Sequence, residues 1–473
     1  MRNILIITTH SLYLYEQNII DEISRCIGCS INYLVMEIKR TSPKRNTMLA
    51  LIDRRFCRLR QNPYETVQAT AFFRKNHESF NSADISSKIY SYVILLGVDR
   101  IPEKIQFKKA LKPEINEKLW FEETILRRKY TTLNLIAADQ TTDWHIVRQI
   151  SVKTEKGIYN NHNKALFHLR YLFNAFFLTK NYLSHYKPVK HYNRRNIYRY
   201  YSFLTRLLFE RKINKKHQNW KIAFIRGEIT EMINQPPNTF WADPFCINEG
   251  DDMWVFFEEM EENQKGKISA CKINGSEVTE KKTVLEQPFH LSFPNVFRKN
   301  GKYYMLPEQS ESGRLDLYTA DRPGGVWEYH STLIPNIRAL DPVWIYHDGK
   351  YWLFFNKIED FEYDNNERIY IYYSDDLFST NWKPHRQNPV IINISKSRNA
   401  GSIFEKDGYL YRPSQNCEIS YGAEVILNKI TKLTEDEYEE VKSGSLNHLN
   451  NWLGMHTYNQ CEGTYVTDFL VEE

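Results

Sequence analysis

The residues best suited to chemistry open a series of repeats in the second half of the chain. Carboxylates, histidines, an arginine and small polar residues recur at these positions, namely Asp243, His290, Ser292, Asp341, Arg398, Asn399 and His456. The strands that follow end in Glu258, Glu259, Glu308 and Gln415. Carboxyl groups held in different protonation states can act as acid and base at a sugar, and arginine binds phosphate through its planar fork. The set therefore indicates a polar, carbohydrate-binding centre.

Three carboxylates are the predicted catalytic groups. Asp243 and Asp341 are each followed by a proline that fixes the local backbone. Glu308 is a candidate acid, because Leu306 and Pro307 give it an apolar setting that would raise its pKa. The predicted substrate-binding residues are Trp241, His290, Ser292, Arg398, Asn399, Arg412, Gln415 and His456. For any single residue the alternative is structural, since Asp and Glu often accept hydrogen bonds from loop amides.

Flat apolar faces for a sugar ring would come from Trp241, Phe293 and Trp344, which lie beside the polar positions. Aromatic residues make up 14% of the chain. Such a content is common in carbohydrate sites, but a β-rich core with many hairpins explains it equally well.

The elements that must position these residues are short strand pairs. Each repeat joins an apolar strand to an aromatic strand, and the repeats recur at roughly 50 to 60 residues, the size of a four-stranded propeller blade. Asn300-Gly301, Asp348-Gly349 and Asp407-Gly408 are typical of tight hairpin turns. Five repeats predict a five-bladed β-propeller, whose first strands bring their polar residues to one channel. The last repeat is short, and the strand Trp220–Arg226 is expected to complete it and close the ring.

The first half has a different pattern. Residues 4–7 and 31–38 are apolar runs around a helical stretch at 13–23, residues 48–59 predict a helix, and residues 90–98 predict a buried strand. We predict a Rossmann-like α/β domain over residues 1–150, a helical basic connector over 151–219 and the propeller over 220–473. A glycine-rich loop does not follow the first apolar run, so we expect no dinucleotide site and no cofactor.

Composition limits the class of protein. The chain has 473 residues, a mean hydropathy of -0.57 and no run of apolar residues long enough to span a membrane or act as a signal peptide. Its seven cysteines are scattered, which favours a reducing, cytoplasmic location. Cys26 and Cys29 are expected to be a buried thiol pair rather than a zinc site. Asp251-Asp252 falls on a hairpin turn, and we predict no metal.

Residues 180–217 are strongly basic. They hold eleven Lys or Arg and one acid, Glu210, against a net charge of +5 for the whole chain. Such a segment can lie on an anionic membrane surface, where each cation contributes roughly 1 kcal/mol. A solvated linker helix between domains is the alternative. Nucleic acid is not an expected partner, because the sequence contains no recognised binding module.

Several motifs together resemble a known family. They are Trp241-Ala-Asp-Pro-Phe245, His290-Leu-Ser-Phe-Pro294, Met305-Leu-Pro-Glu308, Arg398-Asn-Ala-Gly401, Tyr411-Arg-Pro-Ser-Gln415 and Gly454-Met-His-Thr457. This half resembles the five-bladed propeller at the N-terminus of plant glucosamine inositolphosphorylceramide transferases and in bacterial surface-polysaccharide proteins. The first half resembles a degenerate formyltransferase-like domain, without the Asn-x-His that formyl transfer requires.

The propeller is also distantly similar to family 43 and family 32 glycoside hydrolases, which carry three carboxylates on their first three blades. Asp243 matches the first carboxylate. The second blade has Ser292-Phe-Pro where an Asp is expected, and Asp341 stands where the acid Glu belongs.

The resemblance implies a carbohydrate-active protein of cell-surface glycan biosynthesis. The first hypothesis is a glycosyltransferase that takes a nucleotide- or lipid-linked sugar donor and a glycan or lipid-linked acceptor, with Asp243 as the base. It would be cytoplasmic and peripheral on the inner face of the cell membrane. A glycoside hydrolase and a non-catalytic glycan-binding module are the alternatives.

Overall fold

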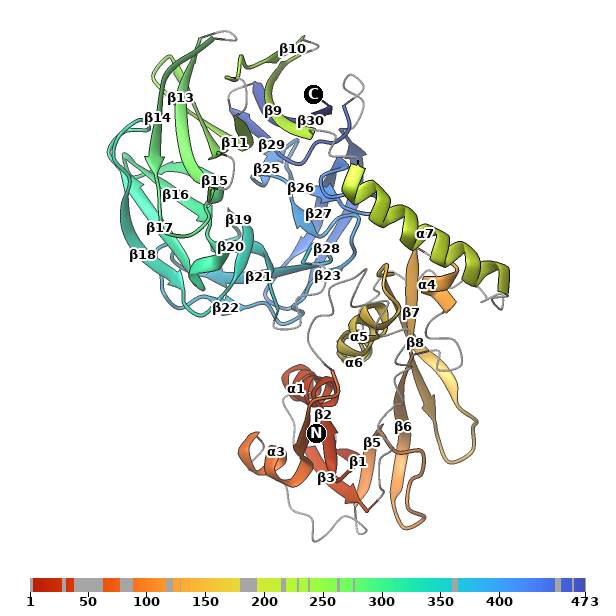
Figure 1. The fold of residues 1–473 in the computed structure, drawn as a ribbon. Coiled ribbons are helices and arrows are strands. Elements are labelled where there is room, and N and C mark those ends of the chain that lie inside the picture. Colours follow the sequence, from red (N-terminus) through yellow and green to blue (C-terminus); the bar gives the residue numbers. More distant parts are fainter. Residues whose placement is uncertain are drawn as a thin grey trace. The chain divides into compact units, whose positions relative to one another are not determined.

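A computed structural model gives the fold of the chain (Figure 1). The structure describes residues 3–27, 31–37, 63–76, 88–115, 122–127, 129–178, 194–213, 218–227, 229–236, 239–261, 264–274, 277–359, 365–446, 452–461 and 463–472. The chain divides into two compact units. The first comprises residues 1–214 with 360–363, and the second comprises the remainder.

The first unit contains a six-stranded sheet. Its strands, in spatial order, are β3 (Ile31–Met36), β1 (Ile4–Thr9), β5 (Ile89–Leu96), β6 (Gln106–Ile115), β7 (Tyr130–Ala138) and β8 (His145–Lys153). The first four strands are parallel to one another, whereas β6, β7 and β8 pair antiparallel. The predicted Rossmann-like domain is therefore not borne out, because half of the sheet is a meander. Antiparallel neighbours need only short links, and the link from β7 to β8 spans only residues 139–144.

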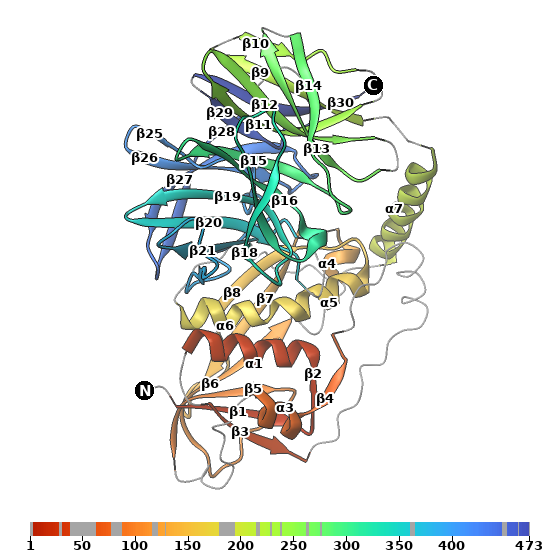
Figure 2. The ribbon, with the colours of Figure 1, turned by 90° about the vertical axis from the view of Figure 1, so that its left-hand side faces the viewer.

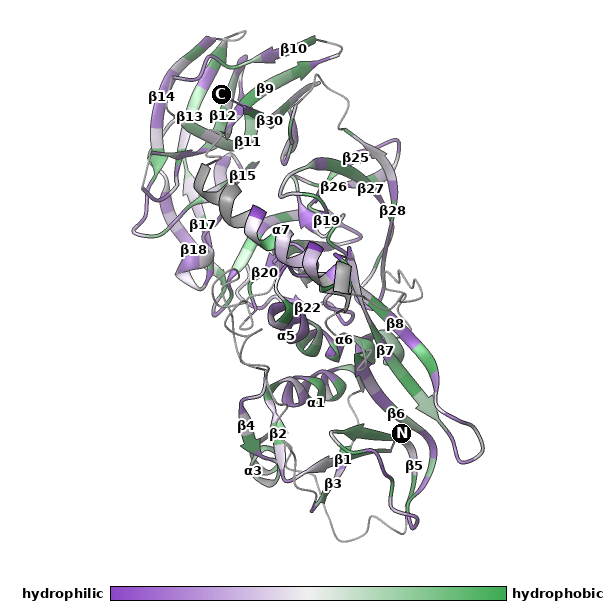
Figure 3. Cartoon of the chain, turned by 45° about the vertical axis from the view of Figure 1, so that its right-hand side comes forward, coloured by the Kyte–Doolittle hydropathy of each residue, from purple (hydrophilic) through white to green (hydrophobic). Residues whose placement is uncertain are grey.

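The described helices of this unit are α1 (Leu14–Ile27), α3 (Ala69–Asn76), α4 (Glu122–Ile125), α5 (Ile158–His168), α6 (Arg170–Phe177) and α7 (Arg194–Ile213). A small separate sheet pairs β2 (Ser11–Tyr13) with β4 (Thr66–Gln68). α1 and α6 lie side by side (Figure 2). β1 is hydrophobic along most of its length (Figure 3), which agrees with its complete burial. The helix predicted over 48–59 lies outside the described residues.

The second unit is a five-bladed propeller, as predicted. Blade 1 is β11 (Phe240–Glu249), β12 (Asp252–Met260), β13 (Lys267–Asn274) and β14 (Glu277–Leu285). Blade 2 is β15 (Ser292–Lys299), β16 (Lys302–Glu308), β17 (Leu315–Ala320) and β18 (Glu328–Ile334). Blade 3 is β19 (Ala339–His347), β20 (Lys350–Lys357), β21 (Arg368–Ser374) and β22 (Lys383–Pro384), with β23 (Ile391–Ile392) also paired to β21.

Blade 4 is β24 (Arg398–Asn399), β26 (Tyr409–Asn416), β27 (Glu424–Leu433) and β28 (Tyr438–Ser445), with β25 (Phe404–Lys406) paired to β26. Blade 5 combines β29 (Tyr458–Cys461) and β30 (Thr464–Glu472) with β9 (Gln218–Arg226) and β10 (Ile229–Met232). Strand β30 pairs antiparallel with β9 along its whole length, which confirms the predicted closure of the ring. The sheets surround a common centre, and the first strands of successive blades contact one another (Figure 1).

Local sequence explains the hairpins. Asn300-Gly301, Asp348-Gly349 and Asp407-Gly408 all have positive φ at both residues. A two-residue hairpin turn of type I′ requires this conformation, and Asn-Gly and Asp-Gly adopt it most readily. Apolar side chains between the blades then form the core, with a large cluster that runs from Phe245 and Phe256 to Ile430. Among the described residues, no helix is both long and apolar enough to cross a membrane.

Candidate functional site

The first strands of three blades share a bulge at an X-Pro step. Asp243, Phe293 and Asp341 have φ of 53°, 46° and 45°, and strand pairing shifts register across each of them. A positive φ at a residue other than glycine costs free energy, so such positions often mark functional sites. Phe293 takes the position in blade 2 that aspartate takes in blades 1 and 3. Its ring is buried and packs against Phe245, 4.9 Å away between centroids.

The second strands end in a set of polar residues. Glu258, Glu308, Asn356 and Gln415 stand opposite Ala242, Ser292, Leu340 and Arg398 of their first strands. Asp468 follows Thr467 on β30, the second strand of blade 5. The sequence analysis named Glu258, Glu308 and Gln415 among these residues, and it did not name Asn356 and Asp468.

His456 lies between two buried aspartates. Its Nε2 is 3.0 Å from Oδ1 of Asp243, and its Nδ1 is 2.9 Å from Oδ1 of Asp468. Burial alone would lower the pKa of His456, but the two carboxylates outweigh it and raise the pKa to about 10. Burial raises the pKa of Asp243, an effect that His456 partly offsets. The positive charge of the protonated His456 ring therefore favours the ionised form of Asp243 and opposes the effect of burial.

Backbone amides hold the same aspartates in place. The Asp243 amide donates to Oδ2 of Asp468 at 2.8 Å, and the Phe293 amide donates to Oδ2 of Asp243 at 3.2 Å. The amides of His456 and Thr457 donate to Oδ1 of Asp468. Asp243 is thus fixed from blades 1, 2 and 5 together.

Arg398 forms a second centre with Asp341. Its guanidinium donates to both carboxylate oxygens of Asp341, with 2.9 Å from Nη2 to Oδ1, and to Oε2 of Glu308 at 3.3 Å. Gln415 donates to Oδ2 of Asp341 at 3.3 Å, and Asn399 donates to the Asp341 carbonyl at 2.8 Å. Burial, and then Asp341, raises the pKa of Glu308 well above its usual value, as predicted from its apolar setting.

Glu258 and His290 form a third group. The ring Nδ1 of His290 accepts a hydrogen bond from the Gly266 amide at 3.0 Å, so its proton resides on Nε2. This Nε2 is 3.2 Å from Oε1 of Glu258. Burial lowers the pKa of His290, whereas burial and then Asp243 raise the pKa of Glu258 well above its usual value. Neutral His290 donates to Oε1 of Glu258, so in the acid form of Glu258 the proton resides on the other oxygen, Oε2.

Other predicted residues lie elsewhere. Trp241 is fully buried, stacks near Phe257 and donates to Glu259 at 3.4 Å, so it offers no open face to a sugar. Phe293 is buried in the core, and Trp344 packs between Phe297 and Tyr351. These three aromatic rings pack within the hydrophobic clusters of the propeller.

Arg412 also has a structural environment. Its guanidinium donates to both oxygens of Glu440 at 2.9 and 2.8 Å, to the Lys396 carbonyl at 2.7 Å and to Oδ1 of Asn399 at 3.1 Å. The side chain is completely buried. Arg412 is therefore placed to orient Asn399 rather than to bind a phosphate. Ser292 stands opposite Glu308 and is 5% exposed.

Tyr421 is a neighbour of the centre that sequence reasoning missed. Its side chain is 44% exposed, and the Arg398 guanidinium lies 5.7 Å from the ring centroid. The centroid of the His456 ring is 5.4 Å from that of the Tyr421 ring. The Trp220 ring, on β9, lies 4.0 Å from the His456 ring between centroids. Tyr421 lies on a loop between β26 and β27, where no periodic pattern points to it. It supplies the open aromatic face that Trp241 does not.

One group within the described residues has donor atoms close enough for a metal ion. Asp243, His456 and Asp468 offer ligand atoms within 4.8 Å of one another. Both ring nitrogens of His456 face carboxylate oxygens, an arrangement that suits a protonated ring, whereas a metal needs a neutral one. The prediction of no metal stays a prediction.

The site thus combines carboxyl groups of opposite protonation preference. Glu258 and Glu308 favour the acid form, and Asp468 favours the ionised form, since His456 outweighs the effect of burial. Residues from all five blades contribute. Fold and site together define a five-bladed propeller with a carboxylate-rich centre.

Comparison with known proteins identifies the family of the chain. Residues 210–462 match the family described as "Glucosamine inositolphosphorylceramide transferase 1, N-terminal", and the chain belongs to this family. A protein named glucosamine inositolphosphorylceramide transferase 1 from Arabidopsis thaliana is 35% identical over 233 residues, which are 47% of this chain and 30% of that protein. The protein of the same name from Oryza sativa subsp. japonica is 34% identical over 210 residues, or 43% and 28%. The chain thus spans under a third of these relatives.

Solved structures with similar folds are more distant. A family 117 glycoside hydrolase from Zobellia galactanivorans is 13% identical, with a TM-score of 0.37, and the match covers 54% of this chain and 91% of that one. The β-xylosidase RS223 is 14% identical, with a TM-score of 0.37 and coverage of 50% and 93%. These values are too low to transfer chemistry. The family match lies in the second half, so a bacterial origin and a formyltransferase-like first half stay predictions.

Proposed function

We propose that the propeller centre catalyses glycosyl transfer in the biosynthesis of a surface glycan. The observation that carries this proposal is Asp243, a buried carboxylate ion-paired to His456 and fixed by two amide contacts. Membership of a family named after a transferase supports the reaction class. Because the chain covers less than a third of the curated relatives, their whole activity does not carry over directly.

In the proposed reaction, Asp243 accepts the proton of an acceptor hydroxyl as that oxygen attacks the anomeric carbon of the donor. Burial raises the pKa of Asp243, and a raised pKa makes a carboxylate a better general base. The bond from the anomeric carbon to the leaving group breaks, and its electrons depart with the leaving group. Arg398 and Tyr421 would orient the donor sugar, and His290 would hold Glu258 in place. Nucleotide-linked and lipid-linked sugars are the two donor classes.

A glycoside hydrolase is the second candidate, and Glu258 is the observation that favours it. Its raised pKa keeps a proton available for a departing glycosidic oxygen, beside Asp243, whose ionised form His456 favours. A phosphate leaving group would not need this proton. The identity of the leaving group therefore separates the two candidates.

We further propose that the basic segment 180–217 brings the protein to the inner, cytoplasmic face of an anionic membrane, where lipid-linked sugars lie. The described part of this segment is α7, on which Arg199 and Arg206 are exposed. Cations near an anionic surface contribute roughly 1 kcal/mol each. Sedimentation with vesicles that contain or lack anionic lipid would test this, and equal binding to both would contradict it.

A product assay tests the central proposal. Wild type, Asp243→Asn and the control Asp316→Asn, a buried carboxylate of blade 2 bonded to Arg314 and Thr332, would be incubated with nucleotide sugars, lipid-linked sugars and aryl glycosides. We expect acceptor-dependent release of nucleotide or lipid phosphate, reduced about 10² to 10⁴-fold in Asp243→Asn only. Release of aglycone would establish hydrolysis instead. Glycan binding without any release would establish a binding module.

A further inference from the structure

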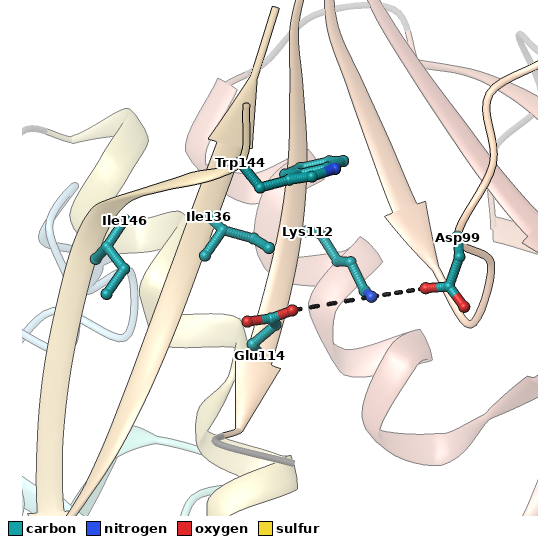
Figure 4. A pocket seen from close by; sticks show the side chains of 6 residues that line it. All are labelled: Asp99, Lys112, Glu114, Ile136, Trp144 and Ile146. Carbon is teal, nitrogen blue, oxygen red and sulfur yellow. Dashed lines mark hydrogen bonds and ion pairs between the residues drawn. The ribbon is translucent and has the colours of Figure 1, made fainter. Parts of the chain in front are cut away.

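A second polar and aromatic pocket lies in the first unit, on the antiparallel half of its sheet (Figure 4). Its volume is about 430 Å³, and its lining residues are Asp99, Lys112, Glu114, Ile136, Trp144 and Ile146. Neither the family match nor the proposed chemistry of the propeller involves these residues.

Strand register puts the lining side chains in one row. Lys112 on β6 stands opposite Ile136 on β7, which stands opposite Ile146 on β8. Glu114 is two residues along β6, so Lys112, Glu114, Ile136 and Ile146 share a face. Trp144 lies in the link just before β8 and lines the same pocket. Trp144 and Ile146 are 42% and 52% exposed, so both present apolar surface to solvent at the pocket.

The link that carries Trp144 is well ordered by its own hydrogen bonds. Oδ1 of Asp139 accepts from the amides of Thr141 and Thr142, both at 2.8 Å, and from the Thr141 hydroxyl. These bonds lower the pKa of Asp139 to about 2, so the turn holds at any ordinary pH. The turn therefore fixes part of the backbone of the link that leads to Trp144.

The charge of the pocket limits the classes of ligand that it can bind. Nζ of Lys112 is 2.6 Å from Oδ1 of Asp99 and 3.9 Å from Oε1 of Glu114. Lys112 is the one cation among the described lining residues, against two carboxylates. The excess negative charge disfavours phosphates, nucleotides and acidic sugars, and it favours neutral or cationic groups.

We propose that this pocket binds a neutral or amino sugar ring of a glycan. The ring would stack on Trp144 and contact Ile136 and Ile146 with its apolar face. Its hydroxyl or ammonium groups would bond to Glu114 and Asp99, and Lys112 would donate to a ring hydroxyl. An aromatic face with a few convergent polar groups is the general design of such sites. The unit would thereby hold a glycan independently of the reaction at the propeller.

The test is ¹⁹F NMR of the full chain labelled with 5-fluorotryptophan. The chain has ten tryptophans, and the resonance lost in Trp144→Phe identifies Trp144, while the other nine report that the variant is folded. The probes are methyl glycosides of glucosamine, glucose and glucuronic acid, which share a ring and differ in charge. We expect the Trp144 resonance to shift with the first two sugars and not with the third.

Two variants sharpen the result. Glu114→Gln should remove any preference for glucosamine over glucose, whereas Glu103→Gln, a control on the link before β6, should leave it unchanged. No shift with any sugar, or an equal shift with glucuronate, would overturn the proposal. A Trp144 resonance that moves with protein concentration alone would also overturn it, because a second copy of the chain would then cover the face.

Discussion

Glu258 and Asp468 lie on the second strands of blades 1 and 5, yet their surroundings shift their pKa values in opposite directions. Burial and Asp243 raise the pKa of Glu258, whereas His456 lowers that of Asp468 despite burial. Neighbouring charge, more than residue type, separates an acid from a base. The sequence identified Asp243 and Glu308 as chemical groups and predicted the raised pKa of Glu308. It did not place His456 between Asp243 and Asp468, because the contact of His456 with Asp243 joins blade 5 to blade 1.

Tyr421 gives the first prediction at this scale. Tyr421→Ala should weaken sugar binding by about tenfold, since one aromatic contact contributes about 0.5–1.5 kcal/mol beyond its area. The melting temperature should stay close to wild type, because the side chain is 44% exposed. Calorimetric titration with the sugar found in the product assay measures the affinity. Tyr409→Ala, 50% exposed at the first residue of β26, is the control, and an equal loss of affinity in both variants would argue against sugar binding by Tyr421.

His456 gives the second prediction, a dependence of stability on pH. Its folded pKa of about 10 lies above the ordinary 6.5, so its contribution is complete below 6.5 and is lost as pH rises through 10. His456→Gln should lower the free energy of unfolding by about 3–5 kcal/mol near neutrality, because two buried carboxylates lose their cation.

Urea unfolding between pH 6.5 and 10 measures this difference. We expect the gap between wild type and His456→Gln to narrow steadily across the range. His330→Gln, an exposed histidine of β18, is the control. A gap that stays constant or widens would show that the ring is not protonated in the folded state.

At the scale of elements, the blade turns follow from local sequence and the bulges do not. Asn-Gly and Asp-Gly pairs select hairpin turns by themselves, so the repeats were predictable. The Phe293 amide at its bulge contacts Asp243 of the preceding blade, and Arg412 of β26 pairs with Glu440 of β28, so both depend on contacts beyond one hairpin. Blade arrangement was therefore predictable, whereas the direction of Trp241 and Arg412 was not. In the first unit, the mixed sheet shows that a strand-helix-strand start does not determine the direction of the later strands.

Gly266 gives a prediction for the link before β13. A Cβ at this position would lie 2.6 Å from the Leu291 carbonyl oxygen, 2.7 Å from His290 and 2.8 Å from Glu258. Gly266→Ala should displace the Glu258 and His290 pair and destabilise the fold by about 1–3 kcal/mol. Gly444→Ala is the matched control, since nothing lies within 4 Å of its added Cβ.

Activity and thermal unfolding measure both variants. We expect the activity of Gly266→Ala to fall by more than the unfolded fraction of the protein at the assay temperature explains. Gly444→Ala should keep the activity and melting temperature of wild type. Full activity in Gly266→Ala would mean that the His290 contact with Glu258 is dispensable.

At the scale of the whole molecule, ring closure depends on β30. This strand pairs with β9 and β29, and it carries Asp468, the partner of His456. Deleting residues 464–472 would expose the edge of β9 and leave His456 with one carboxylate. We expect the propeller to lose cooperative unfolding in calorimetry, since an open ring loses the contacts between its first and last blades. A deleted chain that melts cooperatively at the wild-type temperature would contradict this role.

The closure of the ring also means that β9 is synthesised long before the strand with which it pairs. Strand β9 leaves the ribosome roughly 240 residues before β30, its neighbour in blade 5. At about 5 to 20 residues per second, β9 waits roughly 10 to 50 seconds for its partner. During this wait its inner edge is unpaired and open to other chains. The completed ring hides this edge, so the newborn chain is exposed to aggregation in a way that the mature protein is not.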